Sequence, residues 1–275
     1  MNKNSPENNE IDTDRIEDKY IVPKDKLVEV KHTVETYLPP YFPEPETIYT
    51  INRSIYFDSP DLTFLKQHLS KLDNRRKIRI RCYAPNGIEN HIYFVEVKSR
   101  QNGQSIKTRV QVSNTGFDSV MKNSQIPIDE DLFLTNSQLP KDDVEQHAKL
   151  INYLMLINKC KPMIDITYKR YAHQEHEDLR ITLDTNIKCR PLQMIKMEQI
   201  KDLQNSDLWD KLEEYGNKFS NAEDFVLEVK HKEEGDLPPW VDKMLEGLDA
   251  ESEGFSKYVW GMAQVMRQTL HMIKK

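Results

Sequence analysis

The chain has 275 residues, of which 37% are hydrophobic and 31% are charged, and its formal net charge is −6. This length predicts one large domain or two small ones, and the composition excludes a collagen-like or wholly disordered chain. The sequence also lacks an 18-residue apolar run, an apolar leader and a paired-cysteine motif, so we expect a cytoplasmic protein with no membrane span of its own.

The first third of the chain is expected to begin with a polar tail. Residues 1–14 are rich in Asn, Glu, Asp and Ser, which predicts a disordered segment before a single domain over 15–275. In chain order, the patterns then predict a strand over 15–22, a helix over 24–38, a strand over 50–57 and a short helix from Pro60 to about Leu72. Asp58 or Ser59 is well placed to cap that short helix.

Three alternating segments follow, at 76–83, 91–98 and 105–112, with turn signals between them. They predict an antiparallel meander. The rest of the chain predicts a helix over 142–158, strands over 162–173 and 179–187, a helix over 206–215, a strand over 224–231 and closing helices over 238–248 and 255–273. Eight mostly antiparallel strands with inserted helices indicate an α+β fold built on a barrel or a strongly curved sheet.

Positive charge is concentrated in one part of this acidic chain. Residues 75–109 hold nine basic and two acidic side chains, which gives that stretch a charge of +7. A uniformly basic surface is typical of nucleic-acid binding, and the net charge of −6 disfavours that function here. A local concentration favours a defined anion site.

The strands carry their charges on one face. Side chains two apart on a strand share a face, and this groups Lys77 with Arg79 and Arg81, Glu96 with Lys98, Lys107 with Arg109, Arg180 with Thr182 and Asp184, and Glu228 with Lys230. A solvated outer face is the usual explanation. It fits poorly here, because mostly cationic side chains on neighbouring strands repel each other. We therefore expect a charged lumen that binds a polyanion, with the Ile, Val and Leu faces packed outward against helices.

A Glu-x-Lys pattern recurs on three of these strands. It is formed by Glu17 with Lys19, Glu96 with Lys98, and Glu228 with Lys230. Taken singly, each pair is more simply explained as a salt bridge. Together, and beside so many other cations, they suit a phosphate site in which carboxylates hold a divalent metal.

With these residues in view, the chain resembles the VTC domain, the catalytic domain of the vacuolar transporter chaperone polyphosphate polymerases, within the CYTH-like triphosphate tunnel metalloenzymes. The resemblance is carried by ten segments in order: RIEDKY (15–20), SIYFDS (54–59), KIRIRCY (77–83), FVEVKS (94–99), KTR (107–109), YKRY (168–171), LRITLDTN (179–186), LEVK (227–230), PPWV (238–241) and FSKYVWG (255–261). Each segment is weak alone, and the ordered set is specific.

The resemblance implies an eight-stranded antiparallel barrel that forms a tunnel, with helices outside and a C-terminal helix that closes it. It implies phosphate-binding and catalytic roles for Lys19, Arg79, Arg81, Lys98, Lys107, Arg170, Arg180 and Lys257, and phosphate binding by Arg109, Lys230 and Ser256. It also implies that Glu228 binds Mn²⁺ or Mg²⁺, with Glu17 and Glu96 as further metal or structural candidates.

The sequence departs from the family pattern in two respects. CYTH-type enzymes open with Glu-x-Glu-x-Lys, whereas Arg15 stands at the first position here, which argues against a plain CYTH phosphatase. The eukaryotic polymerases also carry an SPX domain and transmembrane helices, for which this sequence offers no matching segment. A separate membrane partner is therefore a candidate.

The activity implied is transfer of a phosphoryl group from ATP to a growing inorganic polyphosphate. The terminal phosphate of the chain is already an anion, so neither a protein nucleophile nor a Ser or His triad is expected. Two alternatives stay open: a metal-dependent tripolyphosphatase or nucleoside triphosphatase with the same site residues, and a polyphosphate-binding module without activity. The retained Glu228 argues against the last of these.

Overall fold

The computed structural model describes residues 11–12, 15–42, 46–88, 92–101, 104–128, 140–175, 178–219, 223–232, 236–248, 251–252 and 254–273. Most of the predicted tail, residues 1–10 and 13–14, lies outside this part of the chain. Ile11 and Asp12 do not follow the prediction of disorder, because they form a short strand that pairs with Ile106 and Ser105.

One antiparallel sheet runs through the molecule. Its strands are β1 (Ile11–Asp12), β2 (Arg15–Val22), β3 (Thr50–Asp58), β4 (Arg75–Pro85), β5 (Tyr93–Gln101), β6 (Gln104–Val112), β7 (Lys161–Glu175), β8 (Leu179–Pro191) and β9 (Phe225–Lys232). The strand order is β1-β6-β5-β4-β3-β7-β8-β9-β2. The eight predicted strands are β2 to β9, and the β4-β5-β6 meander is confirmed.

The sheet curls into an incomplete barrel. Within the described residues, the strands at the two ends of the order, β2 and the β1-β6 edge, have no backbone pairing with each other. They nevertheless approach across the concave face, because Nζ of Lys98 on β5 lies 3.6 Å from Oε2 of Glu17 on β2. The α+β antiparallel fold with a charged inner face is therefore confirmed, and an ion pair spans the gap that a closed barrel would fill with hydrogen bonds.

Eight α-helices are described, and six of them match the predicted positions. They are α1 (Leu27–Tyr37, preceded by a 3-10 turn at Lys24–Lys26), α2 (Thr63–Leu69), α3 (Asn114–Asn123), α4 (Lys141–Ile157), α5 (Met197–Gln204), α6 (Leu208–Gly216), α7 (Pro239–Glu246) and α8 (Lys257–Ile273). Helices α3 and α5 were not predicted. None of the described helices has the length and apolar content to cross a membrane.

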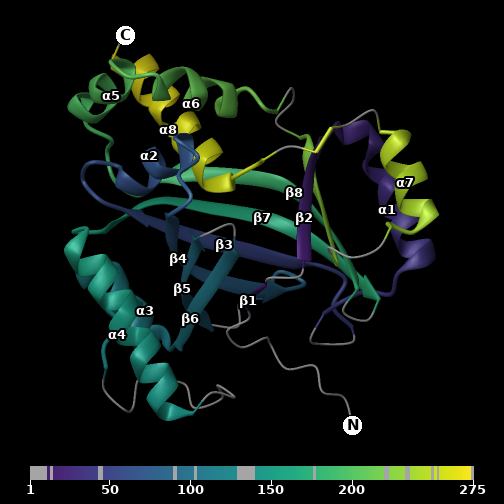
Figure 1. Cartoon of the computed structure of the whole chain (residues 1–275), viewed down its shortest axis with the longest axis horizontal. Helices are drawn as coiled ribbons and strands as arrows, with labels where there is room; N and C mark the ends of the chain where they lie inside the picture. The colour runs from purple at the N-terminus through teal and green to yellow at the C-terminus, as the bar shows by residue number, and fades with distance from the viewer. Residues whose placement is uncertain are drawn as a thin grey trace.

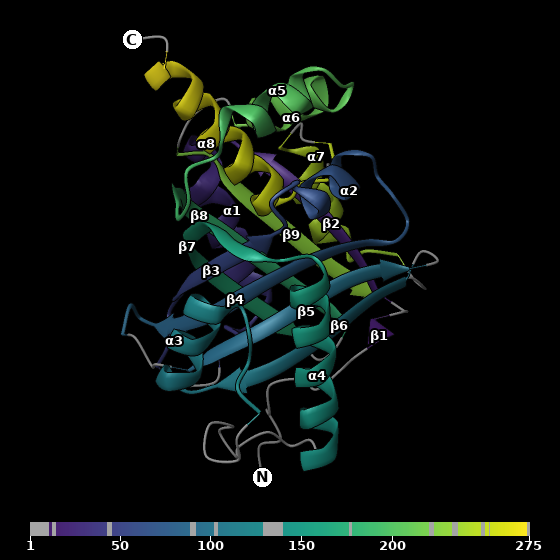
Figure 2. The same ribbon diagram turned by 90° about the vertical axis from the view of Figure 1, so that its left-hand side faces the viewer.

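Two helix pairs cover the outer face of the sheet (Figures 1 and 2). Helices α3 and α4 pack on β4, β5 and β6, where Ile78, Ile80 and Val95 are buried. Helices α1 and α7 pack on β2, β8 and β9 around Ile181 and Leu227. Apolar burial outside the sheet is the main stabilising contribution here, and it leaves the charged residues of the same strands on the concave face.

A third group of helices closes one end of the concave face. Helices α2, α5, α6 and α8 lie together at the top of Figure 1. Tyr258 and Met262 of α8 pack with Ile164 and Ile166, which lie on the concave side of β7. A Cβ at Gly261 would lie only 2.9 Å from the Cδ1 atoms of both isoleucines, so the glycine permits this close approach. The apolar side chains of the C-terminal helix therefore form a plug that fills one end of the concave face. The closing position of this helix was predicted.

A buried carboxylate joins this plug to the sheet. Asp58, at the end of β3, accepts hydrogen bonds from the backbone N–H groups of Phe64 (2.9 Å) and Leu65 (2.9 Å) at the start of α2. It also accepts one from the Tyr258 hydroxyl of α8 at 2.5 Å. Asp58 or Ser59 was predicted to cap a helix from Pro60; α2 instead begins at Thr63 with Leu62 as its N-cap residue, and Asp58 accepts from its first-turn N–H groups from further upstream.

Candidate functional site

The strand register gathers the predicted cations on the concave face, because directly paired residues on adjacent strands share a face. Two rows of paired residues cross β4, β5 and β6: Lys77–Lys98–Lys107 and Arg79–Glu96–Arg109. A third row, Arg180–Lys230–Glu17, crosses β8, β9 and β2. Thr182, Glu228 and Lys19 form the neighbouring row. All the predicted strand residues of the site therefore line the same concave surface.

The row of three lysines concentrates like charge. Lys77 pairs directly with Lys98, and Lys98 pairs with Lys107. Burial lowers the pKa of the Lys77 ammonium well below its usual range, and the positive charges of Lys98, Lys19 and Arg79 lower it further. A bound polyanion would relieve this repulsion. Lys77 was recognised as part of the charged face but not as a site residue.

Across the concave face, Glu17 holds the lysines of β2, β5 and β9. Its Oε2 lies 3.1 Å from Nζ of Lys230 and 3.6 Å from Nζ of Lys98, and its Oε1 pairs with Lys19. Burial raises the pKa of Glu17, but the three ammonium groups outweigh it and leave the pKa well below the usual range. Glu17 is therefore an ionised carboxylate at the centre of a lysine cluster.

Asp184 forms a second junction; the sequence placed it on the charged face with Arg180 but did not mark it as a site residue. Its Oδ1 accepts from Arg170 Nε at 2.5 Å, and its Oδ2 accepts from Arg170 Nη2 at 2.7 Å and from Lys257 Nζ at 2.5 Å. Asp184 is fully buried. Burial raises its pKa, but Arg170 and Lys257 lower it far more, so the carboxylate stays ionised. One aspartate thus links a β7 arginine to the start of α8.

Two of the arginines of β4, Arg79 and Arg81, are held by other side chains. Nε and Nη2 of Arg79 both approach Oε2 of Glu96, at 2.8 and 2.7 Å. Arg79 Nη1 also donates to the Tyr56 hydroxyl at 3.3 Å, and Arg81 Nη2 donates to the Tyr168 hydroxyl at 3.1 Å. Glu96 therefore orients a guanidinium in this structure, and the two tyrosines are positioning groups that the sequence did not single out.

The Glu96 carboxylate predicts a specific acid sensitivity. Burial raises its pKa, but Arg79, Arg81 and Lys107 bring it down to about 2, against an ordinary value of about 4.3. Since the folded-state pKa is lowered, the stabilisation is complete above about pH 4.3 and is lost as the pH falls toward 2; it amounts to about 3 kcal/mol. Glu96→Gln should lose this contribution at pH 7 and show a smaller further loss between pH 5 and 3.

Urea unfolding at pH 7, 5 and 3 measures both effects. The partly exposed Glu145 of α4 supplies the matched control, because its pKa is lowered mainly by its surface partner Lys149 and also by Lys141. Glu145→Gln should keep the wild-type pH dependence. An identical acid response in Glu96→Gln and the wild type would show that Glu96 is not held ionised by Arg79.

Glu228 has the surroundings of a carboxylate that could bind a metal ion together with phosphate oxygens of the substrate. Its Oε1 lies 3.5 Å from Lys230 Nζ, and its Oε2 lies 3.6 Å from Arg170 Nη2, so both of these ion pairs are long. Burial and the Glu17 charge raise its pKa, but Lys230, Lys19 and Arg170 leave it below the usual value. The described residues contain no cluster of three or more metal-binding side chains. One or two carboxylates completed by phosphate oxygens and water suit Mg²⁺ or Mn²⁺, so the residues present fit such an ion.

The remaining predicted residues lie around these clusters. The Arg109 guanidinium lies 4.6 Å from the centre of the Phe94 ring, and that of Arg180 lies 4.7 Å from the centre of the Tyr41 ring. The Ser256 hydroxyl accepts from the backbone N–H of Val259 at 3.5 Å, which places it at the start of α8. Ser256 therefore caps the helix that presents Lys257 to Asp184.

Comparison with known proteins places this surface in a family. The model of the VTC domain matches residues 14–266. The Schizosaccharomyces pombe vacuolar transporter chaperone complex subunit 4 is 26% identical over 273 residues; the match covers 89% of this chain and 36% of that protein. The chain thus spans little more than a third of the length of this relative.

Solved structures with a similar arrangement include two candidate cyclases. One, from Bacillus halodurans, is 14% identical with a TM-score of 0.48, and 88% of this chain and 93% of that chain are covered. The other, from Hippeastrum and described as having a dominant triphosphatase activity, is 15% identical with a TM-score of 0.43, and the coverage is 91% and 96%. The family match, which extends over strands β2 to β9 and most of α8, shows that the chain belongs to the VTC domain family.

Proposed function

We propose that the chain is an ATP-dependent polyphosphate polymerase that transfers the γ-phosphate of ATP to the end of an inorganic polyphosphate. Membership of the VTC domain family supports an enzyme that acts on triphosphate-type substrates. The observation that carries the proposal is the row Lys77–Lys98–Lys107 facing the Glu17 lysine cluster across one concave surface, beside Glu228. Such a surface suits an extended polyanion better than a single phosphate.

The basic side chains would bind and align the two reacting phosphates. Arg79 and Arg81 are oriented by Glu96 and Tyr168, so their free N–H groups are preorganised for phosphate oxygens. The lysines of β2, β5 and β9 would offset the charge of the growing chain. Phosphoryl transfer needs mainly positioning and electrostatic stabilisation, and the attacking terminal phosphate needs no protein base.

Glu228 would hold a divalent cation, Mn²⁺ or Mg²⁺, with Glu17 as a second carboxylate. Such an ion offsets the charge that develops on the transferred phosphoryl group. Lys19 and Lys230 already lie beside both carboxylates and would keep them ionised. We assign Glu96 to the orientation of Arg79, because its Oε2 is engaged by that guanidinium.

Family membership also bears on the proposed location and partners of the chain. We propose a cytoplasmic protein that uses ATP and polyphosphate, and that works beside a separate membrane partner. The relative in Schizosaccharomyces pombe is named as a subunit of a complex, which supports a partner protein.

Incubation of the purified chain with ATP and Mn²⁺ tests the proposal. We expect ADP together with a polymer resolved on gels and seen as chain-internal phosphate by phosphorus NMR. Orthophosphate without polymer, from ATP or from added tripolyphosphate, would replace the polymerase with a hydrolase. Binding of polyphosphate without turnover of either substrate would leave a binding module and contradict the proposal.

A further inference from the structure

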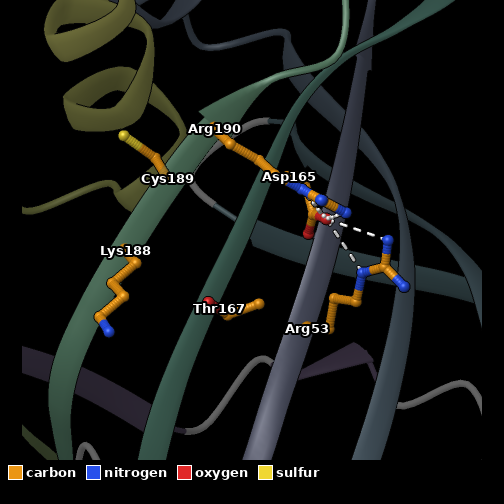
Figure 3. Close-up of a pocket in the computed structure, with 6 residues that line it drawn as sticks. All are labelled: Arg53, Asp165, Thr167, Lys188, Cys189 and Arg190. Atoms are coloured by element: carbon orange, nitrogen blue, oxygen red, sulfur yellow. Dashed lines mark hydrogen bonds and ion pairs between the residues drawn. The ribbon is translucent and has the colours of Figure 1, made fainter.

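A pocket with charged side chains in its lining lies on the outer face of the sheet. It has a volume of about 400 Å³ and is lined by Arg53, Asp165, Thr167, Lys188, Cys189 and Arg190 (Figure 3). These residues come from β3, β7 and β8. The volume falls at the lower end of the range for small-molecule sites. The pocket is therefore large enough for a small ligand and too small for a folded partner.

The pocket lies on the opposite side of the sheet from the proposed catalytic surface. Arg53 and Thr167 are paired in register, and they alternate along their strands with Ser54 and Tyr168. Tyr168 bonds Arg81 on the concave face, so its chain neighbour Thr167 points outward. A ligand in this pocket would not touch the concave-face cations.

A bulge in β8 brings two cations to this outer pocket. Thr167 pairs with Lys188, whereas Lys169 pairs with Thr185, so β8 has one extra residue at this point. Asn186 lies there with a φ of 53°, a conformation that asparagine tolerates. Without the extra residue, Lys188 and Arg190 would continue the inward face of Arg180 and Asp184. The bulge turns both outward and gives Ile187 to the core.

A buried aspartate holds the two arginines of the pocket. Oδ2 of Asp165 accepts from Arg53 Nε at 3.0 Å, from Arg190 Nε at 3.0 Å and from Arg190 Nη2 at 2.7 Å. The Asp165 side chain is only 1% exposed, whereas that of Arg190 is 63% exposed. Each guanidinium has five N–H donors, so both keep donors free for a ligand while the aspartate fixes their planes.

The charges of the pocket favour an anion. Three cationic side chains and one carboxylate line the pocket, and Lys188 forms no ion pair within the described part of the chain. Asp165 Oδ1 is buried without a hydrogen-bond partner there, so it is an unused acceptor beside the two guanidiniums. Fixed guanidiniums bind phosphate oxygens in pairs, and lysine adds a point charge.

We propose that this outer pocket is a second, non-catalytic site for a short phosphate chain, either free inorganic polyphosphate or the triphosphate of a nucleotide. Arg53 and Arg190 bind the phosphate oxygens, Lys188 offsets their charge, and Thr167 supplies a hydroxyl. Asp165 is a positioning residue. The site does not depend on the reaction assigned to the concave face.

Isothermal titration of the whole chain with tripolyphosphate tests the site. To separate it from the concave face, we weaken that face with a background in which Lys98 and Lys107 are both changed to Gln. In addition to any that the remaining concave-face cations hold, this background should bind one tripolyphosphate at the outer pocket. Adding Lys188→Gln should weaken that binding about tenfold or more, because one charge-assisted contact is lost. Arg190→Lys, which keeps the charge and loses the paired donors, should weaken it as well.

Matched charge changes and other anions complete the test. Lys122→Gln with Lys161→Gln removes two exposed lysines elsewhere and should leave the affinity unchanged. ATP binding as tightly as tripolyphosphate would identify the triphosphate as the ligand, whereas tighter tripolyphosphate binding would identify the free chain. Equal binding of sulfate, or an affinity insensitive to Lys188→Gln, would overturn the proposal. Whether or not the outer pocket binds tripolyphosphate, Lys188→Gln should keep its turnover. A failure of this proposal can therefore be distinguished from a failure of the polymerase proposal.

Discussion

Replacing Glu228 with Gln is expected to lower ATP turnover by about a hundredfold or more while the protein remains folded. The substitution keeps the size of the side chain and removes its charge. The Coulombic attraction of Glu228 for a divalent cation is then lost, and such an ion contributes several kcal/mol to stabilisation of the transition state. Lys19, Lys230 and Arg170 stay in place to bind phosphate, so polyphosphate binding should survive.

Steady-state rates over a range of Mn²⁺ concentrations, with tripolyphosphate affinity measured in parallel, check this result. The matched control is Glu175→Gln, which removes an exposed carboxylate at the end of β7. We expect that control to behave as the wild type. Wild-type turnover in Glu228→Gln would remove Glu228 from the proposed metal site, and loss of binding with turnover would instead indicate a structural role.

Replacing Asp184 with Asn is expected to have the largest effect on stability. Asp184 is fully buried, and the side chains of Arg170 and Lys257 that it holds are only 12% and 10% exposed. Removing one partner leaves buried cations without compensation, which typically destabilises a fold by about 3–5 kcal/mol. Turnover should also fall, because Lys257 at the start of α8 loses the group that holds it toward the concave face.

Urea unfolding at pH 7 of Asp184→Asn, Lys257→Met and the double variant measures the coupling directly. The double variant should lose less unfolding free energy than the sum of the losses in the two single variants, since it removes one uncompensated cation along with the carboxylate. Asp207→Asn, at an exposed ion pair on α6, is the control and should have a small effect. Additive losses would show that Asp184 and Lys257 are not coupled.

Helix α3 was not predicted, because its local sequence is a poor helix former and packing against the sheet stabilises it. Helix α3 has the sequence NTGFDSVMKN, whose Asn, Gly and β-branched residues are weak helix formers. It forms because Val120 and Phe117 pack into the core over β4 to β6, and because the Ser113 hydroxyl accepts from Gly116 N–H at 3.3 Å. Tertiary packing supplied what local propensity lacked.

The sequence by itself determined the strands and the charged surface. Alternation with a period of two is a local property, so residues such as Arg79 and Arg81 could be assigned to one face before any partner strand was known. The grouping of Glu228 with Lys230, and the outward packing of Ile78 and Ile80, followed from the same period. The ordered motifs also gave the family.

Only the tertiary structure decided which distant charges meet. The curl of the sheet brings Lys98 to Glu17, and the position of α8 brings Lys257 to Asp184. The bulge at Asn186 reverses the faces of Lys188 and Arg190, which a strict period of two would place inward. These features depend on sheet curvature, helix docking and one inserted residue, and such non-local terms leave no periodic signal in the chain.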